Sequence, residues 1–67
     1  MTLPETFECP CCRKRTLSER GHYEICEVCN WEDDPIQEDD PAYEGGANAD
    51  CLNVAREKFA RHGTSKP

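Results

Sequence analysis

Two cysteine pairs with the same C-x2-C spacing dominate this 67-residue sequence. The first pair is Cys9 and Cys12, the second is Cys26 and Cys29, and the stretch between them is long enough for one hairpin. A tight C-x2-C turn aims two sulfur atoms at one ion, and two such turns complete a tetrahedral shell of thiolates. The spacing therefore predicts one structural Zn2+ ion bound by these four cysteines, although spacing alone leaves iron open as the metal.

The small size of the chain explains why it needs a metal. Only 36% of its residues are apolar, so we expect a single domain, residues 1–67, with a core that requires a staple. The stretch from Met1 to Phe7 has no apolar run, so we expect no export signal, no membrane span and a cytoplasmic location. In a reducing compartment, paired C-x2-C motifs are metal sites more often than disulfides.

Two further cysteines leave alternatives open. Cys11 could replace one ligand of the first pair, although C-x2-C is the more common ligand spacing. Cys51 stands at the start of a predicted helix, where a reactive thiol is conceivable but a buried, apolar role is more typical of free cysteine. Knuckle turns favour a positive φ after the second cysteine, which suits Asn30 better than Arg13.

The segments around the knuckles predict a small metal-stabilised α+β fold with a zinc-ribbon-like hairpin core and a C-terminal helix. Residues 13–18 and 22–25 flank a turn at 19–21, a pattern that predicts a β-hairpin with Tyr23 and Ile25 on one face. Apolar residues recur at helical spacing near the C-terminus, which predicts a helix at about 50–62 closed by Gly63. We expect residues 64–67 to form a frayed tail.

The segment 32–46 is rich in Asp, Glu, Pro and Gly, so we predict an acidic loop there. Apolar contacts of Trp31, Ile36 and Tyr43 are expected to pin it. Because aromatic side chains anchor interfaces and carboxylates steer basic partners, the loop also predicts a protein-binding surface, with core packing as the stronger interpretation for Trp31. The residues of this predicted surface are Trp31, Asp33, Asp34, Glu38, Asp39, Asp40 and Tyr43.

The charge of the chain favours a basic protein as the partner. Fourteen acidic residues against eight basic ones give a net charge of −6, a field that attracts basic proteins and repels nucleic acid. We therefore expect a protein interaction module, such as an inhibitor or an immunity-type partner. The alternative is a zinc ribbon that contacts nucleic acid through the basic residues of the first hairpin, namely Arg13, Lys14, Arg15 and Arg20.

Catalysis is the least expected function. A catalytic zinc keeps an open position for water, whereas four cysteines fill the shell. His22 and His62 do not lie at ligand spacing from a cysteine and are expected at the surface. No nucleophile with an adjacent base is evident, so we predict that the protein is not an enzyme.

Several motifs occur in one order along most of the chain: Cys9-Pro10-Cys11-Cys12, the run 21–34 (GHYEICEVCNWEDD), Asp40-Pro41, Gly45-Gly46-Ala47-Asn48 and a helix from Leu52 to Phe59. In these the sequence resembles the cysteine-rich CPCC family of small bacterial proteins. The resemblance implies a zinc-ribbon-like, metal-binding domain and little else. The family helix tends to start Ser-Leu-x-Glu-Ala-Arg, whereas Cys51 and Val54 stand here at the Ser and Glu positions, so a capping box is missing unless Asn48 or Asp50 caps instead.

Overall fold

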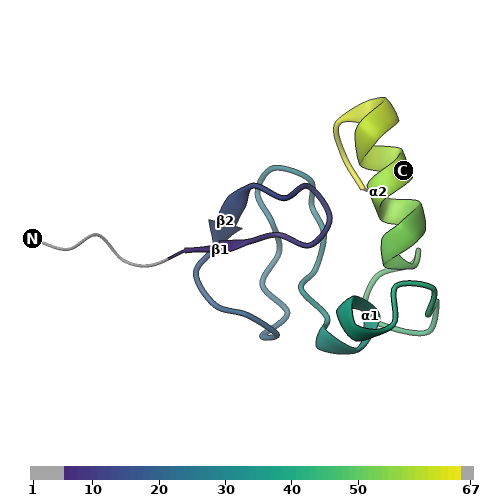
Figure 1. The fold of residues 1–67 in the computed structure, drawn as a ribbon, viewed down its shortest axis with the longest axis horizontal. Helices are drawn as coiled ribbons and strands as arrows, with labels where there is room; N and C mark the ends of the chain where they lie inside the picture. The colour runs from purple at the N-terminus through teal and green to yellow at the C-terminus, as the bar shows by residue number, and fades with distance from the viewer. Residues whose placement is uncertain (1–5, 66–67) are drawn as a thin grey trace, which may run out of the picture.

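The computed structural model describes residues 6–65 and has a small α+β architecture (Figure 1). Its elements in chain order are β1 (Phe7–Glu8), β2 (Arg15–Leu17), α1 (Pro35–Asp39) and α2 (Leu52–His62). Positions 1–5 and 66–67 lie outside the described residues, and the end of the predicted tail is among them. Within the described part of the chain, no helix is long and apolar enough to cross a membrane.

The hairpin is present, but it encloses the first cysteine pair instead of following it. β1 pairs antiparallel with β2, with Phe7 opposite Leu17 and Glu8 opposite Arg15. The prediction of a return strand at 22–25 was wrong, because this segment forms only an isolated bridge between Ile25 and Glu32. A φ of 61° at Tyr23 interrupts any extended strand there.

The segment that replaces the predicted strand is held by a side chain. The Glu24 carboxylate accepts hydrogen bonds from the Ser18 backbone N–H at 2.9 Å and the Ser18 hydroxyl at 2.8 Å. These bonds close the 18–24 segment as a loop, and the hydrogen bond from the Ser18 hydroxyl lowers the pKa of Glu24. Tyr23 and Ile25 are both exposed, so the predicted apolar face of this strand does not join the core.

The acidic segment is not wholly irregular, because it contains the short helix α1. Asp34 caps this helix by accepting hydrogen bonds from the backbone N–H groups of Ile36 and Gln37, and Pro35 occupies the first turn, where its missing N–H costs nothing. The prediction that Ile36 and Tyr43 pin the segment was wrong, since they are 58% and 42% exposed.

Polar side chains pin the acidic segment in their place. Gln37 is fully buried and its Nε2 donates to the carbonyl oxygens of Tyr43 at 3.1 Å, Asn48 at 3.3 Å and Asp50 at 3.1 Å. The Gln37 Oε1 accepts from the Asn48 backbone N–H at 3.0 Å and from its Nδ2 at 2.9 Å. Asn48 in turn bonds to both backbone groups of Glu32. This set of bonds, the Gln37–Asn48 network, replaces an apolar anchor.

Helix α2 matches the predicted boundaries closely and ends as predicted. Gly63 adopts a φ of 74° and donates its N–H to the Phe59 carbonyl oxygen at 2.8 Å, which satisfies one terminal acceptor. At the other end Cys51 is the N-cap without a side-chain cap bond. Asn48 belongs to the network just described and Asp50 forms an ion pair with Lys58, so neither replaces the missing capping box.

The core joins the two knuckles to α2. Its buried members are Cys9, Cys11, Leu17, Cys26, Cys29, Trp31, Leu52 and Ala55, with Phe7, Cys12 and Phe59 packed around them. Half of the buried members are cysteines, so the apolar surface available for a conventional core is small. The stability of the fold therefore depends on the interactions that these sulfur atoms make.

Candidate metal centre

The first knuckle lies between β1 and β2. The Cys9 N–H donates to the Lys14 carbonyl oxygen at 2.9 Å, and the Arg13 N–H donates to the Cys9 carbonyl oxygen at 2.8 Å. These bonds form a tight turn that brings Cys12 to the same side as Cys9. Arg13 adopts a φ of 68°, the strained conformation for which its side chain is poorly suited.

The second knuckle repeats the same turn seventeen residues later in the chain. The Cys26 N–H donates to the Trp31 carbonyl oxygen and the Asn30 N–H donates to the Cys26 carbonyl oxygen, both at 2.8 Å. Asn30 adopts a φ of 68°, the same value as Arg13. The two knuckles are therefore geometrically equivalent, and the first accepts an arginine where the second uses a better suited asparagine.

The two turns bring their four sulfur atoms together. The Sγ atoms of Cys9, Cys12, Cys26 and Cys29 all lie within 4.8 Å of one another. Two pairs join one knuckle to the other, with Cys9 Sγ 3.5 Å from Cys29 Sγ and Cys12 Sγ 3.8 Å from Cys26 Sγ. Bonds of about 2.3 Å to a tetrahedral zinc ion place sulfur atoms about 3.8 Å apart, so the cluster has the size of a metal site with four cysteine ligands.

Neighbouring donors favour the thiolate of Cys26. Its Sγ lies 2.9 Å from the Thr16 hydroxyl and 3.4 Å from the Val28 backbone N–H. Burial raises the pKa of Cys26, but the hydrogen bonds from Thr16 and from the backbone of Cys29 and Val28 outweigh it and lower the pKa to about 7. Cys26 is thus prepared to bind a cation at neutral pH.

The other ligand candidates hold their protons more strongly. Contact with the Cys29 thiol, together with burial, raises the pKa of Cys9, and burial raises the pKa of Cys12. Contact with Cys11 raises the pKa of Cys29. Four thiolates this close repel one another unless a cation lies between them, so metal binding here must release protons and strengthen as the pH rises.

Cys11 and Cys51 lie outside the group of four. Cys11 is buried in the core and its thiol approaches that of Cys29, whereas Cys51 is buried at the start of α2. All six cysteines are free, so no disulfide competes with the cluster. The geometry places Cys12, and not Cys11, in the cluster with Cys9.

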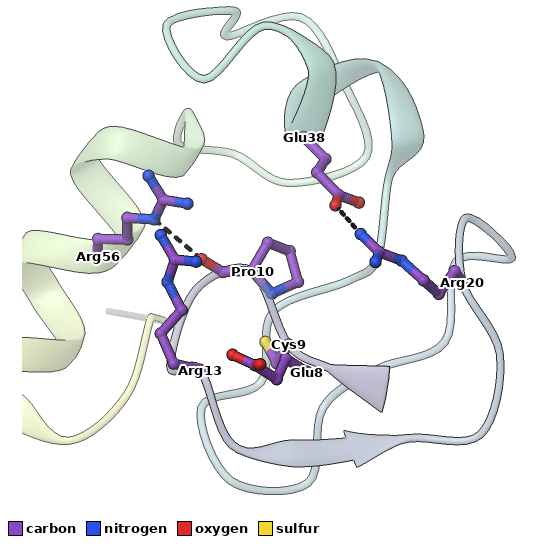
Figure 2. Close-up of a pocket in the computed structure, with 7 residues that line it drawn as sticks. All are labelled: Glu8, Cys9, Pro10, Arg13, Arg20, Glu38 and Arg56. Atoms are coloured by element: carbon purple, nitrogen blue, oxygen red, sulfur yellow. Dashed lines mark hydrogen bonds and ion pairs between the residues drawn. The ribbon is translucent and has the colours of Figure 1, made fainter. Parts of the chain in front are cut away.

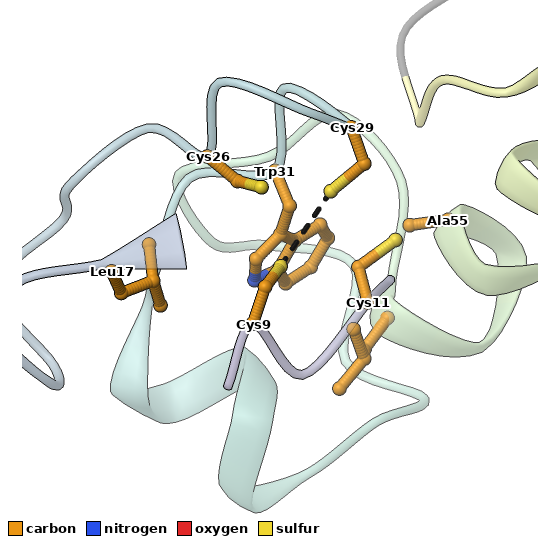
Figure 3. Close-up of a cluster of buried hydrophobic side chains, with 8 residues drawn as sticks. Cys9, Cys11, Leu17, Cys26, Cys29, Trp31 and Ala55 are labelled. Carbon is orange, nitrogen blue, oxygen red and sulfur yellow. Dashed lines mark hydrogen bonds between the residues drawn. The ribbon is translucent and has the colours of Figure 1, made fainter. Parts of the chain in front are cut away.

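Trp31 covers the cluster from inside. It is fully buried, and its ring lies beside Cys9 and Cys29 in Figure 3. This position agrees with core packing, the stronger of its two sequence interpretations. Because the ring excludes water from the sulfur atoms, it also keeps the local dielectric constant low.

The chain beyond α2 also supports the second knuckle. The Ser65 N–H and hydroxyl donate to the Cys29 carbonyl oxygen at 2.7 and 2.9 Å, and the Thr64 hydroxyl donates to the same oxygen at 3.2 Å. Residues 64 and 65 are therefore docked and not frayed. Neither these two residues nor Thr16 was found from the sequence, because a single hydroxyl residue carries no spacing signal.

The predicted partner surface divides into inward and outward side chains. Trp31, Asp33 and Asp34 are buried, so as folded they do not present a surface to a partner. The Asp33 Oδ2 accepts from the Gly21 N–H at 2.6 Å, and the Asp34 Oδ2 accepts from the Ala47 N–H at 2.8 Å, so both carboxylates serve the backbone. For Asp33 and Asp34 the predicted place on a partner surface was wrong, whereas the burial of Trp31 agrees with the core packing expected for it.

The remaining members of that surface point outward. Asp39, Asp40 and Tyr43 are exposed, and Glu38 forms an ion pair with Arg20. The other predicted basic residues of the first hairpin, namely Arg13, Lys14 and Arg15, are exposed as well. His22 and His62 are exposed and stand apart from the cluster of sulfur atoms, as expected.

The sequence was compared with models of known protein families and with curated proteins. The family model described as "Cysteine-rich CPCC" matches residues 7–67, which covers both knuckles, α1 and α2. No curated protein matches the chain.

Proposed function

The chain belongs to the cysteine-rich CPCC family, and we propose that it is a small protein-binding module whose fold is held by one structural Zn2+ ion. The observation that supports the metal is the group of four sulfur atoms within 4.8 Å of one another, from Cys9, Cys12, Cys26 and Cys29. Four thiolates complete the tetrahedral shell of zinc and leave no position for a reactive water molecule. The ion is therefore structural, and the protein is not an enzyme.

The surface we assign to a partner is narrower than the sequence indicates. It consists of exposed carboxylates and apolar side chains on α1 and the turn that follows it, and we call it the acidic rim: Ile36, Asp39, Asp40, Tyr43 and Glu44. Ile36 and Tyr43 supply apolar contact area, and the carboxylates favour a basic protein, such as the target of an inhibitor or immunity-type protein.

The buried network beneath the acidic rim supports a binding role. Gln37 and Asn48 fix the backbone on both sides of the rim, so its exposed side chains start from an ordered scaffold. A preformed surface loses less conformational entropy when it binds than a flexible acidic loop does. The same scaffold explains why Ile36 is exposed, since its neighbour Gln37 occupies the buried face of α1.

Native mass spectrometry tests the metal. We expect a mass that corresponds to one zinc ion per chain, lost on acidification and reduced to background in the variant Cys26→Ser, with Cys51→Ser as a control that retains the ion. Visible absorbance separates zinc from iron, because an iron tetrathiolate is coloured and a zinc one is not. Three disulfides without metal, or a coloured centre, would contradict the proposal.

Charge reversal tests the partner surface. The double variant Asp39→Lys, Asp40→Lys should lose a basic partner that the unmodified protein captures from its own cell lysate, and the capture should weaken as salt is added. Glu57→Lys, an exposed reversal on α2, is the matched control. If both variants retain the partner equally, or if the captured species is nucleic acid, the acidic rim is not the binding surface.

A further inference from the structure

Three arginine side chains line one cavity on a protein that is otherwise strongly acidic. The cavity has a volume of about 330 Å³, and Arg13, Arg20 and Arg56 share its lining with Glu8, Glu38 and the Cys9-Pro10 segment (Figure 2). The arginines come from three separate parts of the chain: the first knuckle, the loop after β2 and the middle of α2. Only the tertiary fold brings them together.

The arginines differ in how their charges are used. Arg20 forms an ion pair with Glu38, so its charge is compensated. Arg56 is half-buried and donates its Nε to the Pro10 carbonyl oxygen at 2.9 Å, which orients the guanidinium but does not neutralise it. Within residues 6–65, the side chain of Arg13 forms no ion pair and no hydrogen bond.

Two uncompensated guanidinium groups therefore face one cavity. Figure 2 shows those of Arg13 and Arg56 at the same end, beside the Pro10 carbonyl oxygen. Two such positively charged groups repel each other, although the chain has fourteen acidic residues that could have formed ion pairs with them. Glu8 lines the cavity but lies beyond ion-pair distance of both. An anion between the two groups would remove the repulsion and satisfy their free N–H donors.

We propose that this cavity binds a single carboxylate group, held by Arg13 and Arg56. The planar guanidinium fork matches a carboxylate with two parallel hydrogen bonds. Three arginines against two glutamates leave the lining with one net positive charge, which suits a monoanion. A phosphate dianion would face Glu8 and Glu38 with an excess of negative charge. The volume lies at the lower end of small-molecule sites, so it accepts the carboxylate with a few further atoms.

The site shares no residue with the acidic rim and only Cys9 with the sulfur cluster. Its ligand would touch the first knuckle through Arg13 and α2 through Arg56, and so would join two elements that otherwise meet at the Arg56–Pro10 hydrogen bond and in the core. The carboxylate can come from a free small acid or from the C-terminus of a peptide. Both present the same group to the two arginines.

A titration of the intact zinc-loaded protein distinguishes these sources. We would follow the 1H–15N signals of the arginine Nε–H groups at constant ionic strength, with N-acetylglycine as the free acid and N-acetylglycinamide as its neutral match. An acetylated tripeptide, N-acetyl-Ala-Ala-Gly, with either a free or an amidated C-terminus forms the second pair. We expect saturable shifts of Arg13 and Arg56 with the acids and at least about tenfold weaker binding of the amides. Equal affinity for both acids indicates a free small acid, and tighter binding of the tripeptide acid indicates a peptide terminus.

Two variants assign the effect to the cavity. Arg13→Gln, which removes an exposed side chain with little risk to the fold, should weaken binding of the acids about tenfold. Arg61→Gln removes an exposed charge on α2 outside the cavity and should leave the affinity unchanged. The proposal is overturned if acids and amides bind alike, if both variants lose equally, or if inorganic phosphate binds more tightly than the acids.

Discussion

Removal of the Gln37 side chain should destabilise the protein more than removal of any carboxylate around it. The two hydrogens on Nε2 serve three carbonyl oxygens within 3.3 Å, and Oε1 accepts two bonds from Asn48, so truncation removes about four bonds. At about 1 kcal/mol for each bond, Gln37→Ala should lower the free energy of unfolding by about 4 kcal/mol. That is a large part of the total free energy of unfolding expected for a domain of this size.

The assay is chemical denaturation at a fixed free zinc concentration, because bound metal adds to the apparent stability. Asp39→Ala, on the same helix but exposed, is the control and should change the free energy of unfolding by less than about 0.5 kcal/mol. Gln37→Met keeps the side-chain length while it removes the hydrogen bonds, and so separates their loss from the loss of volume. If the free energy of unfolding of Gln37→Met lies within about 1 kcal/mol of that of the unmodified protein, the network does not hold the acidic segment and the reasoning is refuted.

Three further perturbations address the cluster and the loop. Thr16→Val removes the hydroxyl beside the Cys26 sulfur, so the pKa of that thiol should rise from about 7 and competition with a zinc chelator at neutral pH should show roughly tenfold weaker binding. Gly46→Ala should destabilise the segment around α1, because the added Cβ would lie 2.6 Å from the Gln37 Cδ. We expect faster hydrogen exchange of the backbone amides in this segment, and unchanged protection would contradict the prediction. Burial raises the pKa of Asp34, but the backbone N–H groups of Ala47, Ile36 and Gln37 outweigh it and lower the pKa. The stabilisation by Asp34 is fully present above about pH 4, which is roughly the pKa of the carboxyl group in the unfolded chain, and is lost as the pH falls through the pKa of the folded state. Asp34→Asn should therefore lower the free energy of unfolding by about 1–3 kcal/mol at pH 7 and flatten the acid denaturation curve.

The cluster of four sulfur atoms could be predicted from the sequence because its signal is local. A C-x2-C turn sets the relative position of two sulfur atoms within four residues, and the repeat of that turn at Cys26 needs no knowledge of distant contacts. The same holds for α2, where helical periodicity and Gly63 define the element and its end. Among the residues of the two knuckles, Arg13 suits the local rule least, because its positive φ is imposed by the requirement to close the first knuckle.

The parts that sequence reasoning missed depend on contacts between distant residues. Asn48 bonds to Glu32 across sixteen residues, and Gln37 bonds to Asp50 across thirteen. The isolated Ile25–Glu32 bridge likewise reflects the turn of the second knuckle more than strand propensity. Buried glutamine and asparagine have no periodic pattern, so composition alone indicated a loop pinned by apolar residues where the structure uses amides.

The two roles of carboxylates in the acidic segment follow from the small amount of regular structure around it. A chain with two very short strands leaves many backbone N–H groups without sheet partners, and each needs an acceptor if it is to be buried. Asp33 and Asp34 supply acceptors to Gly21 and Ala47, so these charges are part of the scaffold. Asp39 and Asp40 remain exposed, so their charges contribute to the electrostatic field at the surface. The net charge of −6 therefore counts groups of two kinds, and only those that face solvent bear on recognition.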